Sequence, residues 1–368
     1  MKKISFVVSS MQSGGAERVA ALLCNRWAEQ GHKVTLIVTF SMRGECFYPL
    51  HQAVKLEYLT DRSGGTGKNA IKAIRRFLSL RRIIITTCPD VVISFLSQVN
   101  VATLLAVLGL RIPVVVSERI YPPAMPLAWH WDWLRKITYP SARKVVMQTE
   151  QGLEWLYQTC PKANGKIIAN PVFYPLPANG QQIESETLPD PIRYRLLAVG
   201  RLEPQKQFAD LILAFSQLEL IFPHWDLTIL GEGSERTHLE FLIAETGLMD
   251  RVLLPGCVGN IADWYNRSDL YVMSSNFEGF PNVILEAMSY GLPVVSFDCK
   301  TGPRDIIRHN IDGLLVPPET GVEGLAKSLK KLMADDILRA QMGRHATSVK
   351  ERFAITRIGA LWDEILGI

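Results

Sequence analysis

Short apolar runs rich in β-branched residues alternate with stretches of helical periodicity in the first part of the chain. The apolar runs predict strands over residues 4–9, 34–40, 91–95, 113–117 and 144–148, and the helical stretches between them include residues 16–30. Strands that alternate with helices are typical of βαβ units, which build a parallel sheet. Near-continuous apolar runs such as VTLIV and PVVVS also fit burial on both faces of such a sheet.

The pattern stops in a proline-rich stretch over residues 171–191 and then restarts. The second series predicts strands over 194–199, 227–230, 251–254, 270–274, 293–297 and 314–316, followed by helices alone over 322–366. We therefore predict doubly wound domains over 1–172 and 193–350, joined by a linker over 173–192. A C-terminal helix over 351–368 follows, and its return to the N-terminal domain is one option.

The expected fold class is α/β, with two doubly wound, Rossmann-like domains. Sheets of this kind bind ligands beyond the carboxyl ends of their strands. Two of them facing each other would form a deep cleft, so we expect the functional site at the strand ends.

Composition agrees with a globular protein, since 48% of the 368 residues are hydrophobic and 21% are charged. The longest uncharged apolar run, 99–110, is shorter than the about 20 residues that a membrane span needs. The N-terminal stretch reads as a first strand, not a secretion signal, because its short apolar run leads into a Gly-Gly turn. Six scattered cysteines without a CxxC pair favour a reducing, cytoplasmic location.

Charge divides unevenly between the two halves of the chain. Residues 1–172 contain 22 Lys and Arg against 10 Asp and Glu, whereas residues 173–368 contain 18 against 26. The halves therefore carry +12 and −8, which sum to the net charge of +4. This asymmetry predicts different partners for the two domains. The basic half suits a nucleic acid, an anionic membrane or a phosphorylated substrate.

Two glycine pairs follow predicted strands. Gly14 and Gly15 stand between the first strand and the first helix, and Gly231 and Gly233 follow the strand at 227–230. Glycines at such turns let backbone approach a ligand, and the next helix directs its positive end toward an anion. A merely tight strand-to-helix turn would have the same sequence, so each pair alone leaves both interpretations open.

Two cations follow the strand at 194–199. Arg201 comes directly after Gly200, and Lys206 lies five residues further on. Both belong at the carboxyl end of a parallel strand, where two positive charges suit a diphosphate. The alternative is an ordinary solvated loop.

The most specific motif pairs two carboxylates, Glu278 and Glu286, around a Gly-Phe-Pro turn. We expect Pro281 in the first turn of a helix, where its missing N–H costs little, and Glu286 just over one turn further on. The helix start offers amides to an anion, and the carboxylates accept hydrogen bonds from sugar hydroxyls. Two ordinary acids at a helix start are the alternative.

Together, the Glu-x7-Glu motif, the Gly-Arg-Leu…Lys segment, the Gly-Glu-Gly turn and the early Ser-Gly-Gly resemble family 4 retaining glycosyltransferases of the GT-B fold. The stretch from Thr301 to Glu319 is also similar to this family. The resemblance covers most of the chain, and the opening SGGAER is similar to bacterial members that extend lipid-linked glycans. It implies that the C-terminal domain binds a nucleotide-sugar, usually a UDP-sugar, and that the N-terminal domain binds the acceptor.

The resemblance also assigns roles to residues. Arg201 and Lys206 would hold the diphosphate, Glu286 the ribose hydroxyls, and Glu278 hydroxyls of the transferred sugar. The remaining donor-binding positions would present backbone to the phosphates or the sugar: Gly14, Gly15, Gly279, Phe280, Pro281, Asn282 and Val283.

The implied chemistry relies on electrostatics rather than on a protein nucleophile. The leaving phosphate helps to deprotonate the acceptor, while cations stabilise the charge that builds on the nucleotide as the sugar becomes oxocarbenium-like. No Asp-x-Asp motif is present to hold a divalent ion. We therefore expect neither a metal nor another cofactor.

One position departs from the family pattern. Many relatives have Ser-Glu-His after the strand written here as PVVVS, whereas this chain has Ser117, Glu118 and Arg119. The histidine of those relatives reaches the donor sugar. Arg119 keeps the ability to donate hydrogen bonds but cannot act as a base, so we expect it to alter sugar or acceptor preference.

Basic and aromatic residues gather between residues 62 and 136. Residues 62–117 contain eight Lys and Arg and one acid, Asp90. Apolar residues recur here at helical spacing, namely Ile71, Ile74 and Leu78. A basic side accompanies them, formed by Lys68, Lys72, Arg75 and Arg76. Three tryptophans follow further along the chain, Trp129, Trp131 and Trp133. The combination favours an anionic membrane and a polyprenyl-diphosphate-linked acceptor over nucleic acid. The alternatives are tryptophans in a core or on a strand face, and a solvated basic helix.

Two rival functions stay open. An NAD-dependent oxidoreductase acting on nucleotide-sugars would need a full GxGxxG after the first strand, and residues 11–15 do not supply it. A non-catalytic subunit that binds a nucleotide-sugar is favoured only by Arg119. We predict a cytoplasmic enzyme, peripheral on the inner face of the membrane, that transfers a hexose or N-acetylhexosamine to a lipid-linked or polysaccharide glycan.

Overall fold

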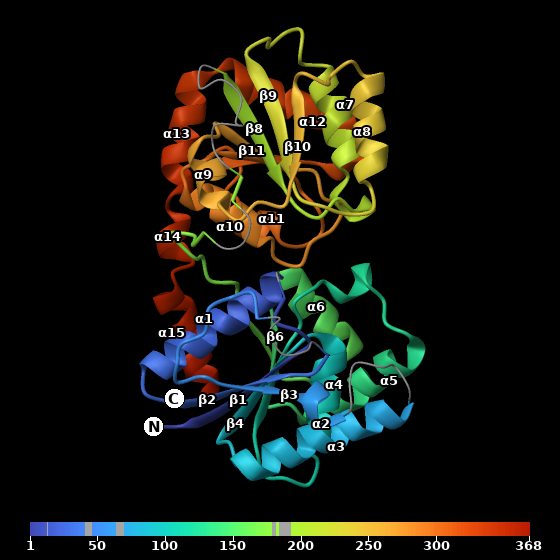
Figure 1. Ribbon diagram of the computed structural model, residues 1–368, viewed down its shortest axis with the longest axis vertical. Helices are drawn as coiled ribbons and strands as arrows, with labels where there is room; N and C mark the ends of the chain where they lie inside the picture. Colours follow the sequence, from blue (N-terminus) through green and yellow to red (C-terminus); the bar gives the residue numbers. More distant parts are fainter. Residues whose placement is uncertain (13, 41–45, 64–69, 179–181, 184–192) are drawn as a thin grey trace. The chain divides into compact units, whose positions relative to one another are not determined.

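The computed structural model describes residues 1–12, 14–40, 46–63, 70–178, 182–183 and 193–368. They form two compact units: unit 1 is Met1–Pro171 with Ile355–Ile368, and unit 2 is Val172–Ala354 (Figure 1). The predicted linker over 173–192 is described at 173–178 and 182–183, and these residues belong to unit 2. The rest of that linker, together with Ser13 and Lys68, lies outside the described residues.

Unit 1 is built on a parallel sheet of seven strands in the order β3-β2-β1-β4-β5-β6-β7. The strands are β1 (Lys3–Val8), β2 (Lys33–Val38), β3 (Lys55–Tyr58), β4 (Val91–Phe95), β5 (Val114–Ser117), β6 (Lys144–Met147) and β7 (Gly165–Ile167). The direction of strand addition reverses between β1 and β4, so the switch point lies there. Every residue of β4 and β5 is buried, as expected for strands covered on both faces.

Helices cover both faces of this sheet (Figure 1). They are α1 (Gly15–Glu29), α2 (Leu59–Ser63), α3 (Ala70–Thr87), α4 (Ser97–Ala106), α5 (Trp129–Thr138), α6 (Glu150–Thr159) and α15 (Ile355–Leu366), with short 3₁₀ turns at Pro122–Ala124 and Tyr139–Ser141. Apolar residues of α3, α4 and α6 share one core with the sheet. On α1 and α15, Trp27 and Trp362 are fully buried against the rings of Phe6 and Phe95.

The C-terminal helix α15 is fixed to unit 1 by polar contacts as well as by packing. The Asp363 carboxylate accepts from Arg26 Nη2 at 2.7 Å and from Trp27 Nε1 at 2.8 Å. Gly359 leaves the space that the Arg26 side chain fills, because a Cβ there would lie 2.2 Å from Arg26 Nε. The last residues of the chain therefore complete the first unit.

Unit 2 is built on a parallel sheet of six strands in the order β10-β9-β8-β11-β12-β13. The strands are β8 (Tyr194–Val199), β9 (Trp225–Leu230), β10 (Val252–Gly256), β11 (Leu270–Met273), β12 (Val294–Phe297) and β13 (Gly313–Val316). The helices are α7 (Phe208–Ser216), α8 (Arg236–Glu245), α9 (Ile261–Asn266), α10 (Asn282–Ser289), α11 (Pro303–Ile306), α12 (Gly321–Ala334), α13 (Asp336–Ala346) and α14 (Val349–Arg352), with 3₁₀ turns η4 (Pro204–Lys206) and η5 (Pro318–Thr320). Apolar residues of α7, α8, α12 and α13 form one core with the sheet.

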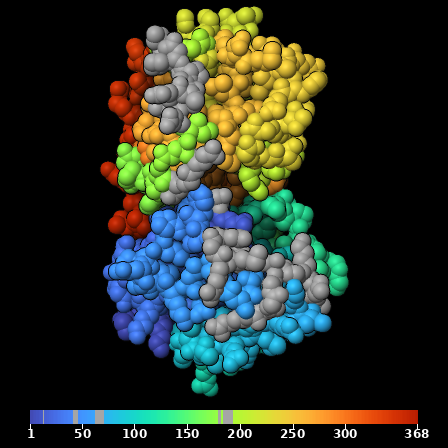
Figure 2. Space-filling model, viewed as in Figure 1, coloured from blue at the N-terminus to red at the C-terminus, as the bar shows by residue number. Residues whose placement is uncertain are grey.

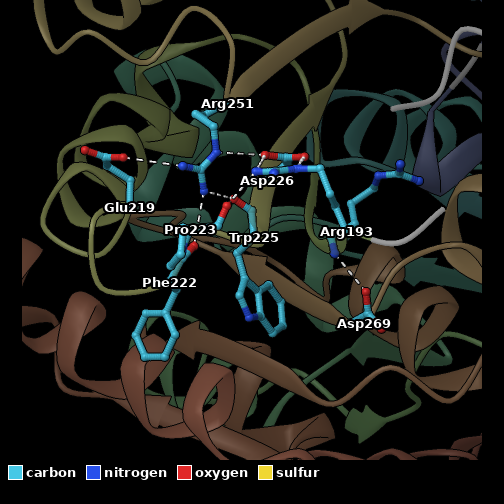
Figure 3. A network of polar contacts seen from close by, with 9 residues as sticks. Arg193, Glu219, Phe222, Pro223, Trp225, Asp226, Arg251 and Asp269 are labelled. Atoms are coloured by element: carbon cyan, nitrogen blue, oxygen red, sulfur yellow. Dashed lines mark hydrogen bonds and ion pairs between the residues drawn. The ribbon is translucent and has the colours of Figure 1, made fainter. Parts of the chain in front are cut away.

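A network of charges joins the amino-terminal ends of β8, β9 and β10 (Figure 3). Asp226, the second residue of β9, is 4% exposed. Its carboxylate accepts from Arg193 Nη2 at 2.7 Å and from Arg251 Nε at 2.9 Å. Arg251 also donates to the Trp225 carbonyl and contacts Glu219 at 3.4 Å. Asp226 thus ties together three chain segments at the end of the sheet opposite the loops that follow β8 and β11.

Candidate functional site

The predicted donor residues of unit 2 gather where its strand order reverses. Because β8 lies between β9 and β11, the loops after β8 and β11 leave the sheet side by side at their carboxyl ends. Open α/β sheets bind ligands at this kind of switch point. Arg201 and Lys206 lie in the loop after β8, and Glu278 lies in the loop after β11.

Hydrogen bonds hold these two loops together. Gln205 Nε2 donates to the Phe277 carbonyl at 2.7 Å, and the Asn276 amide donates to the Gln205 carbonyl at 2.9 Å. Ser274 Oγ donates to the carbonyl of Lys206 at 2.7 Å. The backbone that carries Lys206 is therefore positioned by the loop that carries Glu278.

The two side chains form an ion pair across the loops. Lys206 Nζ lies 2.6 Å from Glu278 Oε1, and the side chains are 14% and 11% exposed. Gly200 provides space for this lysine, because a Cβ there would lie 3.0 Å from Lys206 Cε. Thr301 Oγ1 donates to the backbone carbonyl of Glu278. The pair thus places a preorganised cation beside a preorganised hydrogen-bond acceptor, the Glu278 carboxylate, at the switch point.

Arg201 differs from Lys206 in its surroundings. Its side chain is exposed, and it forms no ion pair with any residue in the described part of the chain. A guanidinium at a strand end, turned to solvent, is available to a phosphate through paired N–H donors. The two predicted cations thus differ: one is held in place by Glu278, and the other is exposed.

The helix α10 begins one residue later than the sequence predicts. Pro281 is its N-cap, with φ −74° and ψ 101°, and the helix runs from Asn282. Pro281 supplies no side-chain hydrogen bond to the helix start. Gly302, at φ +98°, allows a close approach here, because a Cβ would lie 2.6 Å from Pro281 Cδ. Gly279, Phe280 and Val283 flank this helix start, as the motif places them.

Glu286 lies one turn into α10 and is 4% exposed. The Tyr265 hydroxyl donates to its Oε2 at 3.2 Å. Tyr265 in turn stacks on Tyr290, with ring centroids 5.6 Å apart. Tyr265 could not be predicted as part of the site from the sequence, because a tyrosine in a helix carries no motif signal until its contact with Glu286 is known.

The Gly-Glu-Gly turn after β9 supports the neighbouring loop by close backbone packing. Gly231 has φ +144°, and a Cβ on it would lie 1.9 Å from the Gly200 carbonyl oxygen. A Cβ on Gly233 would lie 2.3 Å from the carbonyl oxygen of Leu202. These glycines therefore allow the segment that carries Arg201 to lie against the turn.

Gly233→Ala is expected to displace this segment, because the new methyl group would overlap backbone that cannot rotate away. Forced overpacking costs about 1–3 kcal/mol of stability. Isothermal titration with UDP is the measurement, and we expect affinity to fall about tenfold, the equivalent of 1.4 kcal/mol. Gly247→Ala is the control for backbone strain without overlap, since its φ of +73° disfavours alanine but a Cβ there meets nothing within 4 Å, so only its stability should fall. Equal UDP affinity in the two variants would contradict the packing role of Gly233.

Gly14, Gly15 and Arg119 belong to unit 1. Gly14 is the N-cap of α1, with φ −126° and ψ 159°, so its backbone is one that other residues also adopt. A Cβ there would lie 2.1 Å from Glu17 Oε2, the far end of a flexible side chain, which would have to shift. Glu17 itself accepts from Ser10 Oγ at 2.7 Å.

Arg119 is buried just after β5. Its guanidinium donates to Asn170 Oδ1, lies 3.4 Å from Ser117 Oγ and sits over the Phe95 ring at 4.3 Å. Burial lowers the pKa of Arg119 to about 9, and the charge of Glu17 acts in the opposite direction. Asn170 follows β7 and belongs to no motif, so its contact with Arg119 could not be predicted from the sequence. Contacts with Ser117, Asn170 and Phe95 therefore fix the Arg119 guanidinium, and most of the side chain is shielded from solvent.

The preceding residue, Glu118, anchors a polar cluster in unit 1. It accepts from Ser97 Oγ at 2.6 Å and from the Tyr139 hydroxyl. Burial raises the pKa of Glu118, and Arg135, 3.9 Å away, lowers it in part. Because these partners come from α4, α5 and the turn after α5, the cluster ties the helices of one layer to the end of β5.

Two families match the chain. Residues 13–172 match the family described as Glycosyltransferase Family 4, and residues 181–349 match the family described as Glycosyl transferases group 1. The matches follow the two units. Among the described residues, no helix combines the length and apolar character that a membrane span requires.

Individual relatives agree with these families. A Campylobacter jejuni enzyme named GalNAc-α-(1→4)-GalNAc-α-(1→3)-diNAcBac-PP-undecaprenol α-1,4-N-acetyl-D-galactosaminyltransferase is 28% identical, over 100% of this chain and 98% of the relative. Among solved structures, a Thermosynechococcus elongatus sucrose-phosphate synthase has a TM-score of 0.85 at 17% identity, covering 99% of this chain and 98% of that chain. Anabaena HepE in complex with UDP and glucose has a TM-score of 0.81 at 19% identity, covering 100% of both chains.

These comparisons confirm the α/β fold class and the enzyme class expected from the motifs. Each unit carries the parallel, doubly wound sheet predicted for it, and both family matches are to glycosyltransferases. The chain is a glycosyltransferase whose first half matches Glycosyltransferase Family 4 and whose second half matches Glycosyl transferases group 1.

Proposed function

We propose that this enzyme transfers a hexose or N-acetylhexosamine from a UDP-sugar to a lipid-linked or polysaccharide glycan, with retention of configuration. One observation carries the donor assignment: Lys206 and Glu278 meet at 2.6 Å where the strand order of unit 2 reverses. A cation and a carboxylate held together at such a point can bind a diphosphate and a sugar hydroxyl. The HepE structure with UDP and glucose supports this donor class.

Donor binding would separate the functions of the paired side chains. A diphosphate brings two negative charges, so Lys206 gains a second anionic partner and Arg201 a first. Glu278, relieved of part of this pairing, accepts hydrogen bonds from the transferred sugar. Glu286 accepts from the ribose hydroxyls, with its carboxylate oriented by Tyr265, and the backbone at 279–283 lies against the phosphates or sugar.

The chemical step then depends on charge that is already in place. As the bond between the sugar and the phosphate breaks, negative charge builds on the leaving diphosphate, and Lys206 and Arg201 stabilise it. The acceptor oxygen bonds to the anomeric carbon on the face from which the diphosphate leaves, and a leaving-group oxygen takes its proton, so the configuration is retained. We expect no metal or other cofactor to be needed for this step.

We assign the acceptor to unit 1. Its predicted half of the chain carries +12, which suits a diphosphate-linked acceptor, and the Campylobacter jejuni relative is named for an undecaprenyl-diphosphate substrate. Gly14 and Gly15 stay predicted to present backbone to the phosphates or sugar of the donor, and Arg119 stays predicted to alter sugar or acceptor preference. The bonds of Arg119 to Ser117 and Asn170 support a role in substrate preference, not in proton transfer.

A donor and product test decides the proposal. Purified enzyme is incubated with UDP-sugars and NAD separately, and thermal stabilisation and sugar hydrolysis are recorded. We expect stabilisation by one or more UDP-sugars and none by NAD. With a short polyprenyl-diphosphate-linked glycan, the product should carry an α-anomeric proton by NMR. Stabilisation by NAD alone would overturn the function, a β-linked product would overturn retention, and activity lost in EDTA and restored by Mg²⁺ would overturn the expectation about metal.

A further inference from the structure

An apolar stripe runs along the outer face of α3. Ile71, Ile74, Leu78 and Ile85 recur at helical spacing and are 65%, 59%, 56% and 51% exposed. The opposite face of the same helix enters the core through Leu80, Ile83 and Ile84. The helix is therefore apolar on two sides, and within the described part of the chain only one of them is packed against a core. Exposed apolar surface of this extent marks an interaction site.

Basic residues border this stripe, and α3 carries no acidic residue. At 100° per residue, Arg75 and Arg82 project within about 40° of Ile71, and both are exposed. Two other arginines are engaged elsewhere: Arg81 donates to the Ala106 and Leu108 carbonyls, and buried Arg76 lies over the Phe40 ring. Fewer basic residues of the helix therefore face solvent than its sequence indicates, and the exposed Arg75 and Arg82 lie directly beside the apolar stripe.

The helix α5 adds a second exposed apolar row. Trp129, Trp133 and Ile137 lie one turn apart and are 80%, 56% and 54% exposed. These tryptophans therefore lie on a helix, and neither a core nor a strand face holds them. Trp131 and Leu134 pack against the core instead. The helix α4 contacts both α3 and α5, which places all three in one layer (Figure 1).

We propose that the outer faces of α3 and α5 dock on an anionic lipid bilayer, with the apolar rows in the interface and Arg75 and Arg82 at the headgroups. Charge complementarity favours this partner, because an apolar stripe beside cations and without acids matches negatively charged headgroups. Tryptophans are favoured at the same depth. Part of α3 is visible in light blue on the face of unit 1 that Figure 2 shows. The inference rests on the proposed function in one respect: a lipid-linked acceptor lies in a bilayer.

Vesicle co-sedimentation of the full chain tests the proposal. We expect binding to vesicles of phosphatidylglycerol and phosphatidylcholine at low salt, and weaker binding to phosphatidylcholine alone. Ile74→Glu with Leu78→Glu, and separately Arg75→Glu with Arg82→Glu, should each lower vesicle affinity at least about tenfold. Lys327→Glu with Lys331→Glu on α12 changes the net charge as much as the arginine pair does, and should leave binding unchanged. Leu220→Glu with Ile337→Glu is the matched apolar control, since both residues are exposed in unit 2.

Two further readouts cover the other occupants and the folding of the variants. Brominated lipids should quench tryptophan fluorescence in the parent and less in Trp129→Phe with Trp133→Phe. Light scattering without lipid should show that the parent does not self-associate. Self-association of the parent that the α3 variants abolish would instead assign this face to a second copy of the chain.

Failure to bind phosphatidylglycerol vesicles at low salt would overturn the inference, as would equal losses in the control variants. Transfer to a short, water-soluble acceptor analogue should be the same in the parent and the α3 variants. A parent enzyme that binds vesicles but has no transferase activity would contradict the proposed function alone. A parent enzyme that is active but does not bind vesicles would contradict this inference alone.

Discussion

Lys206→Ala is expected to lower kcat for sugar transfer by about 10²–10³-fold, the usual loss when one preorganised charge is removed from a site where charge develops. Lys206 Nζ is held 2.6 Å from Glu278 Oε1, and hydrogen bonds join its loop to the loop after β11, the neighbouring strand in the sheet. Little reorganisation is therefore needed when the diphosphate leaves. Steady-state transfer assays with a saturating UDP-sugar measure the effect, and the melting temperature reports folding.

Controls separate the charge from the fold. Lys327→Ala removes an exposed lysine from α12 of the same unit and should leave kcat unchanged. Glu278→Gln should also lower kcat strongly, because an amide keeps the size of the side chain but loses its charge. In the double variant Lys206→Ala with Glu278→Gln, the losses should not add, since the two groups act as a unit. A Lys206→Ala rate within a few-fold of the parent would contradict the assigned role.

Central strands could be predicted from the sequence because burial on both faces demands continuous apolar residues. The predicted strands at 91–95 and 194–199 coincide with β4 and β8, and the other predicted strands overlap β1, β2, β5, β6 and β9–β13 within a few residues. The strands β3 and β7 were missed. Both are edge strands with partly exposed residues, among them Lys55 and Lys166, so no apolar run marks them. Edge strands are formed by pairing with a neighbour, which one segment's sequence does not show.

The residues of the candidate site could also be predicted only in part from the sequence. Motif spacing predicted that Arg201, Lys206, Glu278 and Glu286 would follow strands of one domain, and the strand order brings the first three to adjacent strand ends. Spacing could not show that Lys206 pairs with Glu278, or that Tyr265 contacts Glu286, because both contacts join residues distant in the chain. The burial of Arg119 was equally hidden, since it depends on Phe95 and Asn170 from other elements.

Asp226→Ala is expected to destabilise unit 2 by about 1.5–3 kcal/mol, because Arg193 and Arg251 both lose their charged hydrogen bonds to a buried carboxylate, while Arg251 keeps its contact with Glu219. The Asp226 side chain is 6% exposed, and both Arg193 and Arg251 donate to it (Figure 3). The three residues join the beginnings of β8, β9 and β10, whereas the donor loops lie at the opposite end of the sheet. Stability should therefore fall while the donor site of the folded fraction stays intact.

Chemical denaturation measures this loss, with unit 2 followed through UDP binding at low denaturant. Asp226→Asn keeps the shape but removes the charge, so it should destabilise less than alanine, since an amide oxygen still accepts from the arginines. Asp298→Ala is the matched control in unit 2, because its bonds to Arg304 join two partly exposed side chains and contribute at most about 1 kcal/mol. If Asp226→Ala unfolded at the same denaturant concentration as Asp298→Ala, the network would be an ordinary surface feature. If it lost UDP affinity without losing stability, the two ends of the sheet would be coupled in a way that this geometry does not provide.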